Sequence, residues 1–90
     1  MAGRRELVTK VLDGDTFLTA TRKNPVRLAN VDAPERGSPG AAAATEQLRR
    51  LVVGKEVRIE TVARDSHGRS VADVDVGNKS VNKQMRQRLK

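Results

Sequence analysis

The chain of 90 residues contains no cysteine, tryptophan or tyrosine, and Phe17 is its single aromatic residue. Without cysteine it can form no disulfide, no thiolate zinc site and no cysteine nucleophile. No apolar run approaches the roughly 18 to 20 residues of a membrane helix, and residues 1–10 carry no signal-peptide core, so we expect no membrane partner and leave the cellular location open. Apolar residues make up only 37%, and ten of them are alanine, so a thin core must hold the fold by packing alone.

Basic residues are plentiful: 18 Lys and Arg face 11 Asp and Glu, which gives a net charge of +7. Such an excess favours a polyanionic partner such as nucleic acid, although a merely solvated basic surface would show the same balance. The acids are not evenly spread, because Asp13, Asp15, Asp32 and Glu35 lie in two short turn-like segments. This grouping indicates a functional site rather than a need for solubility.

Hydrophobic periodicity and turn residues predict one domain over residues 1–90, mainly β with helices, in the order β-β-β-α-β-β-α. Residues 1–6 are expected to form a disordered tail. Five strands with a helix between the third and fourth are the arrangement of the OB fold, a small Greek-key barrel that binds oligonucleotides and oligosaccharides. The expected strands cover residues 7–12, 16–21, 25–31, 55–63 and 70–76, and the expected helices cover residues 41–53 and 81–90.

Alternation within residues 55–63 places Val57, Ile59 and Thr61 on one face of a strand. We expect that face to be buried. The helical spacing after Ala41 likewise predicts a buried face made of Ala44, Leu48, Leu51 and Val52.

Asp15 and Asp32 follow two different strands and could supply anionic oxygens to a divalent cation, with a backbone carbonyl and waters completing the shell. Their spacing alone allows calcium, magnesium or manganese. It also allows no metal at all, since acids beside turns often accept a nearby backbone N–H. Glu35 adds a third oxygen ligand or a general base.

Arg27 lies on the strand before Asp32, and Arg69 follows a polar turn. Guanidinium groups match phosphate geometry bidentately. Carboxylates combined with guanidinium groups suit phosphodiester cleavage, because cations neutralise the charge that grows on the phosphorus oxygens while a carboxylate activates water.

Three motifs in order make the chain resemble the staphylococcal nuclease (thermonuclease) family, and the resemblance covers nearly the whole chain from about Leu7. They are Val11-Leu12-Asp13-Gly14-Asp15-Thr16, Val26-Arg27-Leu28-Ala29-Asn30-Val31-Asp32-Ala33-Pro34-Glu35, and Arg64-Asp65-Ser66-His67-Gly68-Arg69 followed by Ala72-Asp73-Val74 and Val81-Asn82.

The resemblance implies an OB-fold, calcium-dependent nuclease that hydrolyses DNA and RNA. It implies that Asp15 and Asp32 bind calcium through their carboxylates and Ala33 through its main-chain carbonyl, while other divalent cations stay open. It makes Glu35 the general base, and Thr16 a support of the metal site.

By the same resemblance, Arg27 and Arg69 become catalytic phosphate clamps that also bind substrate. His67 stands where the family's best-known member has a tyrosine that stacks on a nucleotide, so it becomes a candidate substrate contact, with a solvent-facing turn residue as the alternative. The expected substrate is single-stranded or frayed nucleic acid.

The family's third helix has no counterpart in these 90 residues, and we expect a two-fold homodimer to cover the flank that this helix would cover. Two other functions remain open at this stage. One is a nucleic-acid-binding module without catalysis, and the other is a protein-interaction domain.

Overall fold

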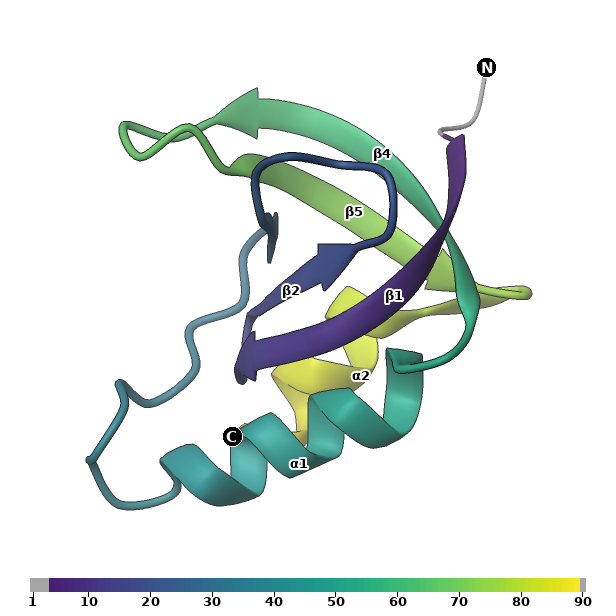
Figure 1. Ribbon diagram of the computed structural model, residues 1–90. Helices are drawn as coiled ribbons and strands as arrows, with labels where there is room; N and C mark the ends of the chain where they lie inside the picture. Colours follow the sequence, from purple (N-terminus) through teal and green to yellow (C-terminus); the bar gives the residue numbers. More distant parts are fainter. Residues whose placement is uncertain (1–3, 90) are drawn as a thin grey trace.

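A computed structural model describes residues 4–89 as a strongly curved sheet with two helices packed against it (Figure 1). The elements are β1 (Arg4–Asp13), β2 (Thr16–Thr19), β3 (Val26–Leu28), α1 (Ala41–Val52), β4 (Glu56–Arg64), β5 (Ser70–Val76), β6 (Lys79–Ser80) and α2 (Val81–Arg88). Both helices lie at the same end of the sheet, below it in Figure 1. No helix in this part of the chain is long and apolar enough to cross a membrane.

The sheet closes into a ring. Its strand order is β3-β2-β1-β4-β5-β6, and an additional pairing joins β3 to β5. That pairing is parallel, with Val26 opposite Ser70 and Leu28 opposite Ala72, whereas the other strand pairs are antiparallel. The observed architecture is therefore the mainly β, OB-like barrel with helices that the sequence predicted.

The hydrophobic core lies inside the ring of strands and between the sheet and the two helices. Phe17, the only aromatic residue, is fully buried in it, together with Leu28, Leu48 and Met85. The predicted helix face is confirmed: Leu48 and Val52 are fully buried and Ala44 nearly so, while Leu51 packs against the core from a partly buried position. A small core of mostly aliphatic residues around Phe17 thus fills the barrel without cysteine or tryptophan.

The first strand begins earlier than predicted. Arg5 and Glu6 pair with Arg58 and Val57 of β4, so residues 4–6 belong to β1 and the expected disordered tail is wrong for them. The remainder of that tail, residues 1–3, lies outside the described residues. The reason is tertiary: Glu6 is buried, with 7% of its surface exposed, and its carboxylate accepts hydrogen bonds from residues far along the chain.

Other bounds also differ from the prediction, and β2 ends at Thr19, two residues earlier than expected. The third strand is limited to Val26–Leu28, because the chain turns at Asn30, whose φ of 59° is left-handed. A sixth strand of two residues, Lys79–Ser80, pairs back onto β5 across the Gly77-Asn78 turn. The closing helix ends at Arg88, and the last residue of the expected 81–90 helix lies outside the described residues.

On β4, Val57 and Ile59 are buried as predicted, but Thr61 is exposed. Among the described residues, the pairing of β1 with β4 runs from Leu7 opposite Glu56 to Arg4 opposite Ile59. The register of β4 against β5 shifts between Thr61 and Ala63. The alternation of apolar and polar residues therefore continues in the sequence past Ile59, the last buried residue of β4.

Candidate active site

The turn between β1 and β2 carries Asp13 and Asp15 and is packed tightly against two other segments. Asp13 Oδ1 accepts the N–H of Asp15 at 3.0 Å, which fixes the turn locally. A Cβ atom on Gly14 would lie 2.6 Å from the Cβ atoms of both Ala33 and Ala44, so only glycine fits there. This close approach holds Asp15 beside the loop that contains Asp32 and Ala33.

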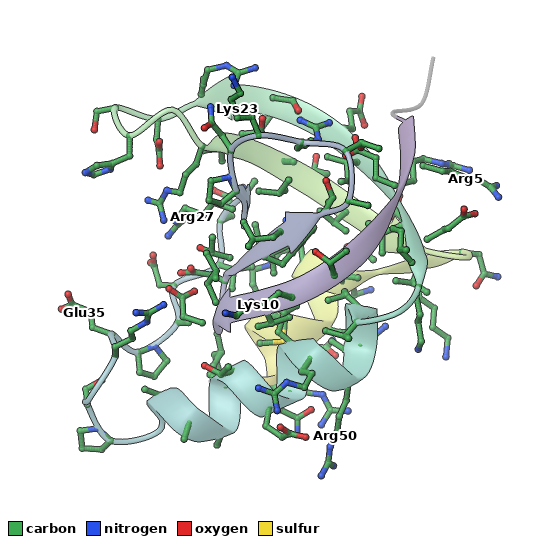
Figure 2. The ribbon with its side chains drawn as sticks, viewed as in Figure 1. Arg5, Lys10, Lys23, Arg27, Glu35 and Arg50 are labelled. Atoms are coloured by element: carbon green, nitrogen blue, oxygen red, sulfur yellow. The ribbon has the colours of Figure 1, made fainter. Side chains whose placement is uncertain are left out.

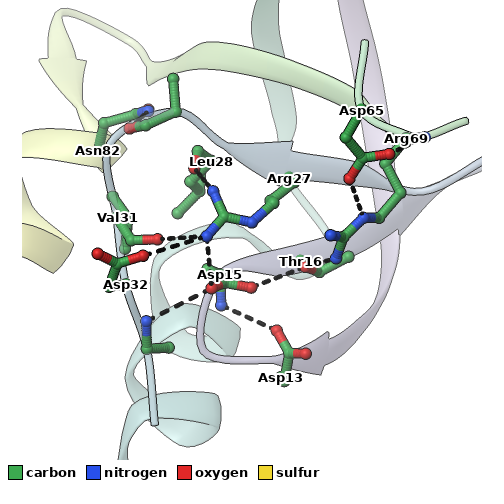
Figure 3. Close-up of polar contacts among 12 residues, drawn as sticks. Asp13, Asp15, Thr16, Arg27, Leu28, Val31, Asp32, Asp65, Arg69 and Asn82 are labelled. Atoms are coloured by element: carbon green, nitrogen blue, oxygen red, sulfur yellow. Dashed lines mark hydrogen bonds and ion pairs between the residues drawn. The ribbon is translucent and has the colours of Figure 1, made fainter. Parts of the chain in front are cut away.

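The guanidinium group of Arg27 joins the two carboxylates predicted to bind metal (Figure 3). Its Nη1 donates to the carbonyl of Leu28 at 3.0 Å, and its Nη2 donates to the carbonyl of Val31 at 3.1 Å. The same Nη2 lies 3.4 Å from Asp32 Oδ1 and 3.5 Å from Asp15 Oδ2. Two backbone carbonyls therefore orient Arg27 while both carboxylates face one of its nitrogen atoms.

Arg69 reaches the same cluster from the turn before β5. Its Nη1 lies 3.5 Å from Thr16 Oγ1, and that hydroxyl donates to Asp15 Oδ1 at 2.8 Å. Asp65 fixes Arg69 from the other side, accepting from its Nε at 2.6 Å and from its backbone N–H at 2.9 Å. A continuous chain of polar contacts thus runs from Asp65 through Asp15 to Asp32.

Asp13 and Asp65 are site residues that the sequence reasoning did not assign. Asp65 precedes Arg69 by four residues in the turn that contains Gly68. This spacing of an acid before an arginine is the sequence signal that could have identified Asp65. Both acids act on neighbours: Asp13 holds the Asp15 backbone, and Asp65 holds Arg69.

The environment moves the pKa values of two of these acids in opposite directions. Burial raises the pKa of Asp15, the hydrogen bond with Asp13 raises it further, and the contacts with Thr16 and Arg27 only partly offset these effects. At Asp65 the loss of solvation would raise the pKa, but hydrogen bonds from Arg69 and from the backbone N–H of His67 outweigh it and lower the pKa below its usual range.

Other predicted site residues lie at the edge of this cluster. The Asp32 side chain is fully exposed apart from its contact with Arg27. Glu35 is also exposed, and Figure 2 shows its side chain on the loop after Pro34, pointing away from Arg27. Within residues 4–89, no hydrogen bond or ion pair joins the Glu35 carboxylate to the cluster. His67 is exposed, and its backbone N–H, not its ring, contacts Asp65.

This donor set offers few side-chain ligands, so a cation bound by it would keep many waters. The carboxylates of Asp15 and Asp32 both face Arg27 Nη2, and the backbone N–H of Ala33 lies 3.4 Å from Asp15 Oδ2, which brings residues 32 and 33 beside that carboxylate. Residues 4–89 hold no group of three or more histidine, aspartate or glutamate side chains placed to bind a metal ion. Since Ca²⁺ takes six to eight oxygen ligands, backbone and water oxygens would supply most of its shell here.

Residues 25–88 match the family model described as staphylococcal nuclease homologue. The chain belongs to this family. An uncharacterized endonuclease of Escherichia coli O157:H7 is 36% identical over 69 residues, covering 74% of this chain and 45% of that protein. An uncharacterized endonuclease of Haemophilus influenzae is 35% identical over 81 residues, covering 87% and 46%.

A micrococcal nuclease of Shigella flexneri is 35% identical over 69 residues, covering 74% of this chain and 40% of that protein. The chain thus spans less than half the length of these three curated relatives. The matched region contains both arginines of the cluster, together with Asp32, Ala33 and Glu35.

Proposed function

We propose that this chain is a nuclease that hydrolyses phosphodiester bonds of DNA or RNA with a divalent cation, calcium by family resemblance. One observation carries the proposal: Asp15 contacts Arg27 directly and Arg69 through Thr16. The Asp15 carboxylate, which we propose as a cation ligand, therefore lies beside both guanidinium groups that we propose to bind phosphate. The family membership and the relatives named as endonucleases support the same reaction.

Electrostatics supports the need for a cation. The cluster contains four carboxylates, from Asp13, Asp15, Asp32 and Asp65, against the two guanidinium groups. A phosphodiester anion entering this surplus of negative charge would be repelled. A divalent cation held by Asp15, Asp32 and the Ala33 carbonyl would offset the surplus and neutralise charge on the phosphate. It would also favour the ionised form of Asp15.

The two arginines have positions suited to donors that act on the phosphate. Arg27 is oriented by the carbonyls of Leu28 and Val31, and Arg69 by the carboxylate of Asp65. Preorganised donors of this kind stabilise the charge that accumulates on the phosphorus oxygens in the transition state without having to reorganise. Thr16 positions Asp15 through its hydroxyl group.

Glu35 is the proposed general base. It lies on the same loop as Asp32 and is exposed, and its carboxylate has no ion-pair partner within residues 4–89, so it is available to accept a proton from the attacking water. We also propose an unpaired substrate strand. The exposed His67, next to the turn that carries Arg69, can stack only on a base that is free of its partner strand.

A second candidate function is a nucleic-acid-binding module without catalysis. The position of Glu35 away from Arg27, together with the lack of a three-ligand metal group among residues 4–89, favours it specifically. Such a module would bind a strand through its arginines and cleave nothing.

Hydrolysis of denatured DNA separates the two functions. The wild type is assayed with calcium and with a chelator, beside Glu35→Gln and the control Glu60→Gln, which changes an exposed carboxylate on β4. If the chain is a nuclease, the chelator abolishes activity. The rate then falls about 10²- to 10⁴-fold in Glu35→Gln and stays unchanged in the control Glu60→Gln. Binding of DNA without cleavage in any divalent cation supports the binding module.

The metal ligands need their own measurement. A calcium titration of the wild type should give a dissociation constant of roughly 10⁻⁴ to 10⁻³ M, because few protein ligands contribute. Asp15→Asn and Asp32→Asn should each abolish calcium binding. Unchanged calcium binding in both variants would contradict the proposed metal site.

A further inference from the structure

A second basic feature lies outside the cluster, at a surface cavity of about 230 Å³ lined by Arg22, Lys23, Asn24, Arg64 and Ser70. Three of these five residues are cationic, and none is acidic. Neither the metal ligands nor the two phosphate-binding arginines line the cavity.

Arg22 is a fixed part of the cavity wall. Its Nε lies 2.8 Å from Oε2 and 2.9 Å from Oε1 of the buried Glu6, and its Nη1 donates to Ser70 Oγ at 3.0 Å. Thr19 and Thr21 also donate to the Glu6 carboxylate. Glu6 therefore compensates the charge of Arg22 and holds its guanidinium group in place.

Lys23 and Arg64 differ from Arg22, because both are exposed and neither takes part in an ion pair within residues 4–89. The contact of Arg64 with the carbonyl of Gly68 is long, at 3.4 Å. Two uncompensated positive charges beside a fixed guanidinium group attract an anion. Asn24 and Ser70 add neutral polar groups of the kind that contact phosphate oxygens.

The cavity continues the proposed active site along the same two segments. Ser70 directly follows Arg69, and Asn24 precedes Arg27 by three residues. Ser70 donates its N–H to the carbonyl of Pro25 at 3.1 Å, so the two segments are joined at this point. In Figure 2, Lys23 lies at the end of the barrel opposite α1, with Arg27 between them.

Three residues can span at most roughly 10 Å, which corresponds to at most about three nucleotides at the stacked spacing of about 3.4 Å. We propose that Lys23 and Arg64, beside the fixed Arg22, bind a backbone phosphate of a polynucleotide strand a few nucleotides from the phosphate held by Arg27 and Arg69. This inference rests on the proposed function. It makes the substrate a polymer and not a mononucleotide or dinucleotide.

The test compares the double variant Lys23→Gln/Arg64→Gln with the control Lys55→Gln/Arg86→Gln, which removes two exposed charges from the α1–β4 connection and from α2. Binding of a labelled 12-nucleotide DNA strand is followed by fluorescence anisotropy in a chelator at several salt concentrations. Calcium-dependent hydrolysis of the same strand and of a thymidine dinucleotide gives kcat/KM for a long and a short substrate. Cooperative thermal melting confirms that each variant is folded.

The double variant should bind the 12-nucleotide strand about tenfold more weakly, and its salt slope should fall by about 0.7 for each phosphate that the protein no longer neutralises. Its kcat/KM should fall on the 12-nucleotide strand and match the wild type on the dinucleotide, while the control variant matches the wild type throughout. Equal decreases on both substrates would overturn the inference, since the cavity would then hold no distant phosphate.

The two proposals fail in different ways. If the double variant binds and cleaves the long strand as the wild type does, the cavity is no subsite and the nuclease proposal stands. If the wild type binds the strand through this cavity but cleaves nothing, the subsite stands and the nuclease proposal falls.

Discussion

At the scale of single residues, the geometry of donors counts as well as their charge. Arg27 donates to two carbonyls from two different nitrogen atoms and lies close to two carboxylates, which a single ammonium group cannot reproduce. Arg69 likewise makes contacts with Asp65 and Thr16 from separate nitrogen atoms.

We therefore expect Arg27→Lys and Arg69→Lys each to lower kcat on the order of 10²-fold although the charge is kept. Steady-state kinetics on denatured DNA measures the effect, with the exposed Arg86→Lys as the matched control. Wild-type turnover in either variant would show that charge alone is sufficient there.

Asp65 predicts a pH dependence of stability. Its pKa is lowered in the folded state, so its ionised form stabilises the fold above its ordinary pKa, and this contribution disappears as the pH falls through the lowered value. Asp65→Asn should unfold at lower urea concentration than the wild type at pH 7, and the difference should shrink towards strongly acidic pH. A difference that stays constant between pH 7 and pH 3 would contradict the role given to its ionised form.

At the scale of elements, the site depends on how turns and helices pack against one another. Gly14 brings the β1–β2 turn into contact with Ala33 on the loop and with Ala44 on α1. The fold thus ties the position of Asp15 to the position of a helix outside the cluster.

Gly14→Ala should destabilise the protein by about 1 to 3 kcal/mol through overpacking, and should weaken calcium binding because the turn must move. Gly77→Ala is the matched control. Position 77 has a φ of 60°, so alanine is strained there, but its Cβ would meet no atom within 4 Å. Urea unfolding and calcium titration check both variants. An equal decrease of calcium affinity in the two would show that general destabilisation, and not displacement of the turn, is the cause.

Asn82 links α2 to the barrel. It is buried, with 2% of its surface exposed. Its Oδ1 accepts the N–H of Val74 at 2.8 Å, and its Nδ2 donates to the carbonyls of Ala29 and Ala72 at 3.0 Å each. Three backbone groups from two segments are therefore hydrogen-bonded to one amide.

Replacing Asn82 with leucine should lower the free energy of unfolding by about 2 kcal/mol, because the Val74 N–H and the Ala29 carbonyl lose the Asn82 amide. The Ala72 carbonyl keeps its hydrogen bond from the Ala29 N–H at 2.8 Å. The control Gln87→Leu changes an exposed residue of the same helix and should stay within about 0.5 kcal/mol. Urea titration at pH 7 measures both. Equal stability of Asn82→Leu and the wild type would show that these groups find other partners.

At the scale of the whole molecule, the net charge of +7 is unevenly distributed. Acidic residues concentrate around Arg27 and Arg69, whereas Lys23 and Arg64 stand apart without acidic partners within residues 4–89. In the proposed function, a polynucleotide strand would meet the acidic cluster with its cation and, apart from it, the cavity lined by Lys23 and Arg64.

The homodimer stays a prediction from the sequence. Mutual repulsion at +7 opposes association, so the dimer should be more populated at moderate salt, where the charges are screened, than at low salt. Sedimentation equilibrium at several protein concentrations in both salts measures it. A monomer mass independent of concentration, together with a cooperative melt, would reject the dimer.

Features that depend on near neighbours in the chain could be predicted from the sequence alone. Alternating apolar residues predicted β5 with its observed bounds, helical spacing predicted the buried face of α1, and the Asp13-Gly14-Asp15 turn indicated where two strands meet. The three motifs also marked the residues that meet around Arg27, because side chains that follow neighbouring strands come together at one end of a barrel.

Contacts between groups that are far apart in the chain could not be predicted, because they form only in the folded barrel. Residues 4–6 form a strand because Glu6 finds Thr19 and Arg22, and Thr61 is exposed where the register of β4 against β5 shifts. The parallel pairing of β3 with β5 and the basic cavity beside Ser70 have the same origin. Periodicity records the faces of one element, whereas burial and charge pairing arise only when register and chain closure bring separate elements together.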